Sequence, residues 1–270
     1  MTDVLARRER FASVGSTNDI VRGWLADGVP EVCLAVSDDQ TAGRGRDGRR
    51  WVGSAGAALL LSLGFRPTWL APDGVWRLAA IVSLAMAEAA EVTAGLAEGT
   101  VGLKWPNDLV AATGPTGELR KVAGVLGETN GLGTADPRVV VGLGVNVDWP
   151  AADFPPDLAA IMTSLREAAG GRPVDRDALL EAFVARLGER VEALRSGRFD
   201  AIAWAGRQVT SGRTVRVLTA SGETSVCATG VDPATGALLI VDAECTDGAR
   251  ALLVGEVTHV RLADPIAGTV

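Results

Sequence analysis

The sequence predicts an α+β protein, a β-sheet flanked by helices and followed by a small β-barrel. Three observations indicate this. Short, nearly continuous apolar runs such as residues 57–65 are typical of strands buried on both faces of a sheet. Residues 73–91 and 175–194 carry apolar side chains at helical spacing. After about residue 212, short strands alternate with hairpin signals, as they do in small barrels.

The N-terminal part predicts one helix and one strand that lead into a polar loop. We expect residues 1–10 to form a short arm. Ser16 opens an apolar-periodic stretch that stops at Gly28, which is the pattern of a capped helix. Residues 32–36 predict a strand, and the glycine-rich residues 37–50 predict the loop.

The middle of the chain predicts two long helices and three further strands. Asp73 is placed to cap the first long helix, and the second begins at about Asp175. The strands are predicted at residues 101–105, 121–128 and 139–145, with a loop rich in Gly, Pro and Thr at 112–118.

The C-terminal segment predicts five short strands. The hairpin signals between them are Ser-Gly at 221–222, Thr-Gly at 235–236 and Asp-Gly at 247–248. The single histidine, His259, is interpreted as a residue of the last strand. We therefore expect a domain over residues 1–210 and a barrel over residues 211–270. The strands are predicted at residues 214–218, 224–230, 238–241, 251–254 and 257–262.

Composition restricts the compartment and the class of partner. The 270 residues are 47% hydrophobic and 22% charged, which is typical of a soluble globular protein. No apolar run is long enough to span a bilayer, and no secretory h-region opens the chain. We therefore expect a cytoplasmic protein without a membrane partner. A net charge of −7 disfavours a nucleic-acid partner, because phosphate contact needs a basic face.

Residues that carry metal or redox chemistry are scarce. Three cysteines, Cys33, Cys227 and Cys245, form no CxxC pair and predict reduced thiols. One histidine supports no recognisable zinc site or Ser–His–Asp triad. Lys104 and Lys121 are the only lysines among 26 basic residues. Because arginine's planar fork does not reproduce a compact ammonium, both lysines are candidate site residues.

The segment from Gln40 to Trp51, QTAGRGRDGRRW, predicts an anion-binding loop. Its glycines match GxGxxG, but that dinucleotide fingerprint needs a helix directly after it, and here a strand follows. Glycines let the backbone approach phosphates closely, and arginine forks bind phosphate or carboxylate oxygens. We therefore favour a mobile loop that closes on an anionic ligand. A solvent-exposed arginine-rich hairpin loop is the alternative.

Two further motifs place a lysine near the end of a strand. In GLKWPND, a strand delivers Lys104 and an aromatic ring, and proline then turns the chain. Asn107 and Asp108 follow, where they would contact a nucleotide or its magnesium ion, or simply form a turn. In RKVAGVLGE, Lys121 enters an apolar strand and Gly124 permits close approach of a ligand. An exposed lysine without a catalytic role is the alternative for Lys121.

These motifs resemble those of the biotin–protein ligase family in order and approximate spacing. They are STN at 16–18, QTAGRGR at 40–46, KWPND at 104–108, RKVAG at 120–124 and GLGVN at 142–146, and the resemblance spans about residues 12–262. It implies a catalytic domain related to class II aminoacyl-tRNA synthetases and lipoate ligases, with a mixed sheet, and an SH3-like barrel. It also implies that ATP, with Mg²⁺, activates biotin to biotinyl-5'-AMP. Biotin then passes to a lysine of the biotin carboxyl carrier domain of an acyl-CoA carboxylase.

The resemblance further implies the role of each site residue. Lys121 would contact the biotin carboxylate and the α-phosphate, and Arg46, with Arg44, would close over the adenylate and exclude water. Biotin and its adenylate would be bound by Ser16, Thr17, Asn18, Gln40, Gly43, Arg44, Gly45, Arg46, Lys121 and Gly124. ATP would be bound by Trp51, Lys104, Asn107 and Asn146, with Asp108 as a metal contact.

The chain departs from the family's pattern in two ways. Bifunctional members carry an N-terminal helix-turn-helix domain, whereas the ligase motifs here begin at Ser16, so we expect no repressor role. Asp47 occupies a loop position that is often basic in the family, which bears on loop closure. A lipoate or octanoate ligase of the same superfamily and a non-catalytic biotin-binding protein are the alternatives. Nothing in the sequence predicts the oligomeric state.

Overall fold

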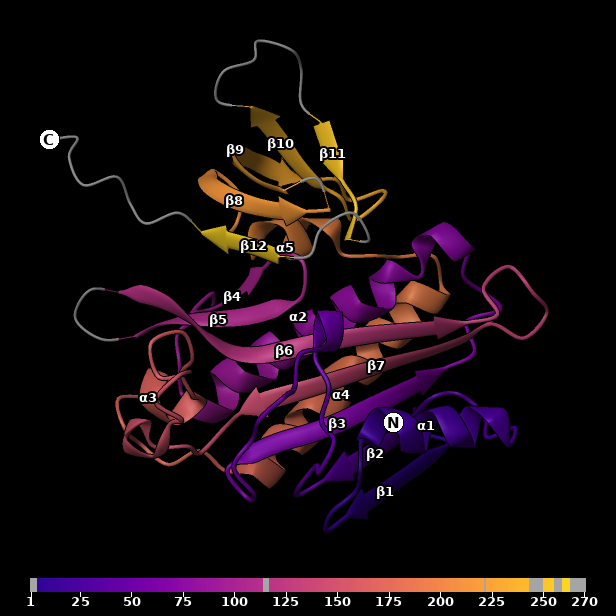
Figure 1. The fold of residues 1–270 in the computed structure, drawn as a ribbon. Helices are drawn as coiled ribbons and strands as arrows, with labels where there is room; N and C mark the ends of the chain where they lie inside the picture. The colour runs from indigo at the N-terminus through magenta and orange to yellow at the C-terminus, as the bar shows by residue number, and fades with distance from the viewer. Residues whose placement is uncertain (1–3, 114–116, 221, 243–249, 255–258, 263–270) are drawn as a thin grey trace, which may run out of the picture. The chain divides into compact units, whose positions relative to one another are not determined.

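The computed structural model describes residues 4–113, 117–220, 222–242, 250–254 and 259–262, and it divides into two compact units (Figure 1). The first unit comprises Met1–Val101 and Asp108–Phe199, and the second comprises Gly102–Asn107 and Asp200–Val270. Strand β4 (Val101–Lys104) crosses this division. The functional boundary near residue 210 stays a prediction.

The first unit is built on a mixed β-sheet, as predicted. Its strands lie in the order β1-β2-β3-β7-β6-β5, and only β1 and β2 pair in parallel. All eight residues of β3 are buried, which confirms that its apolar run is covered on both faces. The bounds are β1 Arg7–Phe11, β2 Cys33–Ser37, β3 Ala58–Phe65, β5 Asp108–Thr113, β6 Glu118–Asn130 and β7 Arg138–Asn146.

Two predictions for this sheet were wrong. Residues 1–10 are not simply an arm, because Arg7–Phe11 forms β1 on the sheet edge. Its charged side chains carry no strand pattern but find distant partners, such as Arg8 with Glu181 and Arg10 with Asp38. The second is strand β5, where the sequence indicates a turn at Asn107 and Asp108 and a loop at 112–118; antiparallel pairing with β6 makes Asp108–Thr113 a strand. Residues 114–116 of that loop lie outside the described residues.

The long helices cover the two faces of this sheet. Helix α1 (Thr17–Ala26) lies on one face, and α2 (Trp76–Ala94) and α4 (Arg176–Arg195) lie on the other (Figure 1). Asp73 does not cap α2, because it lies in the preceding 3₁₀ turn η2 (Pro72–Gly74). Asp175 does cap α4, accepting hydrogen bonds from the backbone N–H of Asp177 and Ala178. The shorter helices are η1 (Arg46–Gly48), η3 (Ala151–Asp153) and α3 (Leu165–Ala168).

The second unit contains an antiparallel sheet in the order β11-β10-β9-β8-β12, which agrees with the predicted small barrel. Buried and exposed residues alternate along the middle of β8. His259 opens β12, as its interpretation as a barrel-strand residue requires. The hairpin signal at 247–248 and Cys245 lie outside the described residues. The elements are α5 Ala201–Gly206, β8 Arg213–Thr219, β9 Gly222–Val231, β10 Leu238–Asp242, β11 Arg250–Leu252 and β12 His259–Leu262.

Within the described ranges, none of the helices combines the length and the apolar character needed to cross a membrane.

Candidate active site

Three glycines leave a shallow trench on the face of the sheet that carries α1. Gly142 lies opposite Ser62 of β3, and Gly144 lies opposite Gly124 of β6. Because they have no side chains, other groups lie directly on the strands. A methyl group on Gly142 would overlap the Asn18 carboxamide, and one on Gly124 would lie 2.9 Å from Lys121 Nζ. Gly124, Gly142 and Gly144 together are called the glycine trench.

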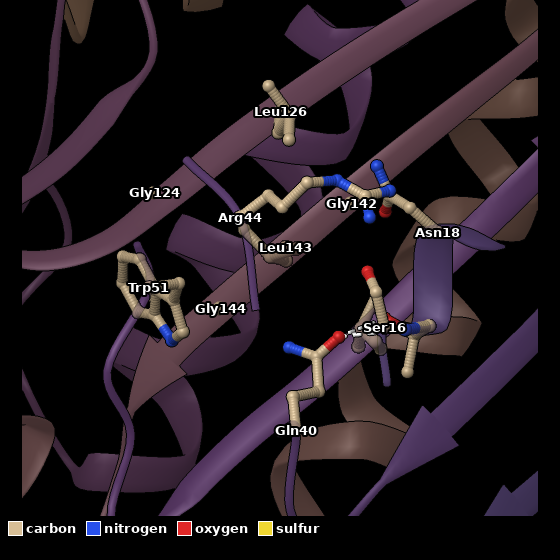
Figure 2. A pocket seen from close by; sticks show the side chains of 12 residues that line it. Ser16, Asn18, Gln40, Arg44, Trp51, Gly124, Leu126, Gly142, Leu143 and Gly144 are labelled. Atoms are coloured by element: carbon tan, nitrogen blue, oxygen red, sulfur yellow. Dashed lines mark hydrogen bonds between the residues drawn. The ribbon is translucent and has the colours of Figure 1, made fainter. Parts of the chain in front are cut away.

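One end of the trench is lined by neutral polar side chains, here called the neutral end: Thr17, Asn18, Gln40 and Ser62. Ser62 Oγ donates to Asn18 Oδ1 at 2.5 Å, and Thr17 Oγ1 lies 2.7 Å from Ser62 Oγ. Because the single hydroxyl proton of Ser62 is donated to Asn18, Thr17 is the donor in any bond to Ser62. Gln40 Oε1, 3.1 Å away, is a second acceptor for the Thr17 hydroxyl. Gln40 Oε1 accepts from the Thr17 backbone N–H at 2.7 Å. The Gln40 carbonyl therefore faces α1, and its amide nitrogen points the other way (Figure 2).

Glu128 sets the orientation of this network. Its carboxylate accepts a hydrogen bond from Asn18 Nδ2 at 2.9 Å. A carboxylate can only accept, so the Asn18 amide must turn its NH₂ toward Glu128 and its carbonyl toward Ser62. Asn18 is 4% exposed and Ser62 is 0% exposed. Each of these buried polar groups thus has a partner, as burial requires.

Ser16 stands at the N-cap position of α1, as predicted, but its side chain makes no capping hydrogen bond. Gln40 instead satisfies the first backbone N–H of the helix, that of Thr17. Ser16 lines the pocket and is 4% exposed. The sequence signal located the start of the helix correctly, although the capping contact comes from a distant loop.

The opposite, charged end of the trench is built around Lys121 on β6. Lys121 Nζ lies 2.5 Å from Asp108 Oδ1 and 5.3 Å from the centre of the Trp51 ring. The Lys121 backbone is fixed by two hydrogen bonds to the segment around Met162, since its N–H donates to Ile161 O and its carbonyl accepts from Thr163 N. The ammonium is thus attached to a rigid strand, and its side chain is only about one-third exposed (34%).

The loop from Gln40 to Trp51 folds back on itself. Trp51 N donates to Gly43 O at 3.0 Å, and Gly45 N donates to Arg49 O at 2.6 Å. Asp47 has a φ of 57°, a left-handed conformation that Asp tolerates better than most residues. Asp47 also pairs with Arg49 at 3.2 Å. The residue that departs from the family pattern therefore stabilises the turn of the loop.

The two arginines of the GRGR segment have different surroundings. Arg44 makes a bidentate pair with Asp19 of α1, at 2.8 and 2.7 Å. Hydrogen bonding to Asp19 raises the pKa of Arg44, and the same bond lowers the pKa of Asp19. Arg46 is half-buried, and this burial lowers the pKa of its guanidinium. A bound anion would therefore compensate the Arg46 guanidinium for the hydration that it loses on burial.

The Trp51 ring lies in the trench beside Gly124 and Gly144 (Figure 2). A methyl group on Gly144 would lie 2.6 Å from Trp51 Nε1. In this position the ring covers the backbone of Gly144, which is one part of the trench floor. A ligand that lies along the whole trench therefore requires the ring to move. The pocket is lined by Ser16, Thr17, Asn18, Gln40, Arg44, Trp51, Leu61, Gly124, Leu126, Gly142, Leu143 and Gly144.

Asn146, at the end of β7, presents an unused acceptor. Its Nδ2 donates to Thr163 O at 2.9 Å, which fixes the orientation of the amide. Its Oδ1 is buried and has no hydrogen-bond partner among the described residues. An unpaired buried carbonyl is costly, so this atom is a candidate to accept a hydrogen bond from a ligand.

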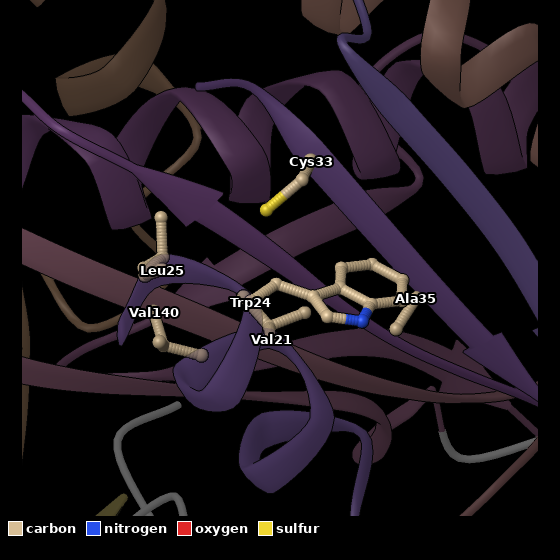
Figure 3. Close-up of a cluster of buried hydrophobic side chains, with 6 residues drawn as sticks. All are labelled: Val21, Trp24, Leu25, Cys33, Ala35 and Val140. Atoms are coloured by element: carbon tan, nitrogen blue, oxygen red, sulfur yellow. The ribbon is translucent and has the colours of Figure 1, made fainter. Parts of the chain in front are cut away.

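A cluster of buried apolar side chains anchors α1, and with it the neutral end (Figure 3). Gly64 of β3 permits this packing, because a methyl group there would lie 2.6 Å from Cys33 Sγ and 2.7 Å from Val21 Cγ1. Burial of Cys33 raises the pKa of its thiol to about 11. The cluster comprises Val21, Trp24, Leu25, Cys33, Ala35 and Val140.

The fold and the motifs now have counterparts among known proteins. The model of the biotin/lipoate A/B protein ligase family matches residues 11–146. The biotin–(acetyl-CoA-carboxylase) ligase of Mycobacterium tuberculosis is 32% identical over 93% of this chain and 88% of its own length. The chain belongs to the biotin protein ligase family. It is a ligase, as the resemblance of its motifs predicted.

Further family members agree. The bifunctional ligase/repressor BirA of Bacillus spizizenii is 29% identical over 88% of this chain and 71% of its own length. The structure of the Aquifex aeolicus biotin protein ligase in complex with biotin and ATP is similar with a TM-score of 0.77, at 26% identity, over 95% of this chain and 99% of that one. This similarity confirms the predicted fold class.

Most of the predicted site residues meet around the trench. Ser16, Thr17, Asn18, Gln40, Arg44, Trp51 and Gly124 line the pocket, Lys121 and Asp108 adjoin it through Gly124, and Gly43, Gly45 and Arg46 lie on the loop. Asn146 follows Gly144 on β7. Lys104 and Asn107 fall in the second unit, so a place beside the other residues stays a prediction for them.

Sequence reasoning missed Asp19, Ser62, Glu128, Gly142 and Gly144 as site residues. A signal existed for Ser62, which is the one hydroxyl in the apolar run of β3. The glycines of β7 were recognised as a motif but without a role. Asp19 and Glu128 carried no signal, because ordinary surface helices and strand ends are rich in carboxylates.

Among the described residues, no group of three or more His, Cys, Asp or Glu side chains could hold a metal ion. Asp108 is one carboxylate on the edge of the charged end, and it pairs with Lys121. One carboxylate suits Mg²⁺ that arrives with the phosphates of a nucleotide, because Mg²⁺ commonly keeps few protein ligands.

Proposed function

We propose that this chain activates biotin with ATP and transfers it to a lysine of a biotin carboxyl carrier domain. The observation that carries this proposal is the order of groups along the trench. A neutral hydrogen-bonding end, a floor without side chains and a rigidly held ammonium match the ureido head, the hydrocarbon tail and the carboxylate of biotin.

The neutral end would recognise the uncharged head of biotin. Ser16, Thr17, Asn18 and Gln40 are predicted to bind it, and Ser62 joins them through Asn18 and Thr17. Donors and acceptors held in fixed orientations reject a ligand that lacks their counterparts. This favours biotin over lipoate, whose dithiolane ring has no such polar groups. Leu126 would cover part of the tail.

The charged end would promote attack of the biotin carboxylate on the α-phosphorus of ATP. Lys121 would neutralise both the carboxylate and the α-phosphate, which otherwise repel each other. This requires the Lys121–Asp108 pair to loosen as the substrates enter. Pyrophosphate leaves, and biotinyl-5'-AMP remains bound.

The nucleotide would be held by residues on either side of the trench. The Oδ1 atom of Asn146 is oriented to accept a hydrogen bond, which suits the amino group of adenine or a ribose hydroxyl. The Trp51 ring, once displaced from the trench, would pack against the base. Asn107 would join Trp51 and Asn146 around the adenine and the ribose phosphate, and Lys104 would face the β- and γ-phosphates. Asp108 would hold Mg²⁺, whose chemistry is to neutralise phosphate charge.

The loop from Gly43 to Arg46 would close over the adenylate. A mixed anhydride hydrolyses in water, so it must be shielded until the acceptor amine arrives. Arg46, half-buried on this loop, would provide the charge. The ε-amine of the carrier lysine then attacks the acyl carbonyl of the adenylate, and AMP leaves.

Partners and location follow from this reaction. The carrier would be a domain of an acyl-CoA carboxylase, as the name of the Mycobacterium tuberculosis relative suggests. The second unit is a candidate for docking it. A cytoplasmic location fits a reaction that consumes ATP. We propose no repressor role and no nucleic-acid partner, which the net charge of −7 supports; a gel-shift assay at low salt tests this.

The test is pyrophosphate release from Mg·ATP with biotin or lipoate, each with and without a biotin carrier domain. We expect turnover with biotin only, a sharp rise on adding the carrier, and covalent biotin on that carrier by mass spectrometry. Turnover with lipoate alone would make the chain a lipoate ligase. Tight binding of biotin without pyrophosphate release would make it a non-catalytic binding protein.

A further inference from the structure

Arg44, in the loop's GRGR segment, binds the body of the protein through its guanidinium. It extends across the pocket toward the start of α1 (Figure 2). There, two parallel hydrogen bonds join it to Asp19, at 2.8 and 2.7 Å. Bidentate pairs of this kind are the strongest and most directional contacts that arginine makes.

A second carboxylate lies at the same place. Glu128 Oε1 is 3.7 Å from Arg44 Nη2, and Glu128 Oε2 accepts from Asn18 Nδ2 at 2.9 Å. Glu128 therefore adjoins both the loop and the neutral end. Arg22 pairs with the same two carboxylates, at 2.7 Å to each. Two acids thus face two arginines, and the local charge is balanced.

This arrangement separates the tasks of Arg44 and Arg46. The fork of Arg44 is directed at carboxylates of α1 and β6, away from Lys121 and Asp108 at the other end of the trench. A guanidinium engaged in this way is poorly placed to bind phosphate. Arg46 lies two residues further on, in η1, where burial lowers the pKa of its guanidinium.

We propose that Asp19 and Glu128 form an acidic clasp that holds the glycine-rich loop against α1 through Arg44. Arg44 is then a positioning residue, which keeps the loop closed over biotin and its adenylate, rather than a ligand of the phosphates. This inference rests on the proposed ligase function. Two carboxylates that contact neither biotin nor ATP would thus determine how long biotinyl-AMP stays bound.

The decisive variant is Asp19→Asn, because it leaves the Asn18–Glu128 bond of the neutral end intact. We expect the release of biotinyl-AMP to accelerate about five-fold and KM for biotin to rise about five-fold. This is the largest change that the loss of an exposed ion pair allows, because such a pair contributes up to roughly 1 kcal/mol. The rate of adenylate formation at saturating substrates should change by less than two-fold. Single-turnover formation and dissociation of radiolabelled adenylate measure both.

Arg22→Gln is the matched control. It removes the other cation from the same carboxylates but leaves the loop's own attachment, so adenylate release should stay near the wild-type rate. Arg44→Gln should accelerate the release of biotinyl-AMP as Asp19→Asn does, and the double variant should release it no faster than either single variant. The exchange Asp19→Arg with Arg44→Asp should restore part of the retention. Added NaCl should speed release from the wild type but not from Asp19→Asn.

Two results would overturn the clasp. One is wild-type retention in Asp19→Asn; the other is a loss of adenylate formation in Arg44→Gln at unchanged retention, which would make Arg44 a phosphate ligand. Both results are interpreted only if the wild-type enzyme forms adenylate. A wild type that forms none would instead refute the proposed function, so the two failures are distinguishable. Thermal unfolding of each variant identifies any that fail to fold.

Discussion

The two ends of the glycine trench are organised on different principles. At the neutral end, Asn18 and Ser62 are almost fully buried and each has a protein partner. At the charged end, Lys121 is about one-third exposed and pairs with a single carboxylate, Asp108. The side chains of the neutral end are thus held in position before any ligand arrives, whereas the charged end must exchange a partner.

The difference follows from the cost of burial. A hydroxyl or amide can be buried once it is hydrogen-bonded, whereas an ammonium buried with one carboxylate loses more hydration than the pair returns. Recognition of an uncharged group can therefore be built from buried, rigid side chains. Chemistry on charged groups needs a site that stays partly hydrated until the substrates replace the water. We therefore expect the neutral end to determine which substrate is selected and the charged end to determine the rate of biotin activation.

The largest effect should come from Lys121→Ala. Without the ammonium, the repulsion between the biotin carboxylate and the α-phosphate is unopposed, and adenylate formation should fall by roughly a thousand-fold. Biotin binding, measured by calorimetry, should weaken far less. Lys121→Arg is the control that retains the charge, and we expect it to recover little, because the planar fork does not fit a site built for a compact ammonium. Wild-type adenylate formation in Lys121→Ala would assign the rate to another group.

The next largest effect should come from Ser62→Ala at the neutral end. It leaves Asn18 Oδ1 without its donor, at a cost of roughly 1–3 kcal/mol, while Thr17 keeps Gln40 Oε1 as an acceptor. KM for biotin should rise roughly ten- to a hundred-fold with kcat nearly constant. Ser83→Ala is the matched control, because the Ser83 hydroxyl donates to the carbonyl of Ala79 in its own helix, away from the trench residues. A fall in kcat at constant KM would contradict the division of tasks between the two ends.

A smaller effect should come from Arg46→Ala. Loss of the half-buried guanidinium should raise leakage of biotinyl-AMP roughly ten-fold, which is the scale of one charge-assisted hydrogen bond. The measurement is hydrolysed adenylate in the medium during single turnover without a carrier. If leakage stays at the wild-type level, shielding of the adenylate does not depend on this residue.

The smallest effect concerns Cys33, which lies beneath α1. Because burial raises the pKa of its thiol to about 11, the thiol stays protonated at pH 8, and iodoacetamide should leave it unmodified in the native protein. Cys227 is less buried and serves as the internal comparison by peptide mass spectrometry. Rapid alkylation of Cys33 would show that α1, and the neutral end with it, is not firmly anchored.

Much of the site could be predicted because its residues stand in contiguous motifs. The STN segment, the GRGR loop and the RKVAG strand each combine a polar group with a local backbone pattern, and the structure brings them to one trench. Ser62, Asp19 and Glu128 could not be found in this way, since each matters through a partner far away in the chain. The Glu128–Asn18 bond, for example, spans 110 residues.

The sequence by itself determined the buried strand of residues 58–65, the long helices and the candidate groups for chemistry, because hydrophobic period and residue type act locally. Tertiary structure alone decided that the charged segment Arg7–Phe11 is a strand, that Gln40 satisfies the first turn of α1, and that Arg44 faces carboxylates. The physical reason is that hydrogen bonds and ion pairs are made by whichever groups the packed core brings within reach.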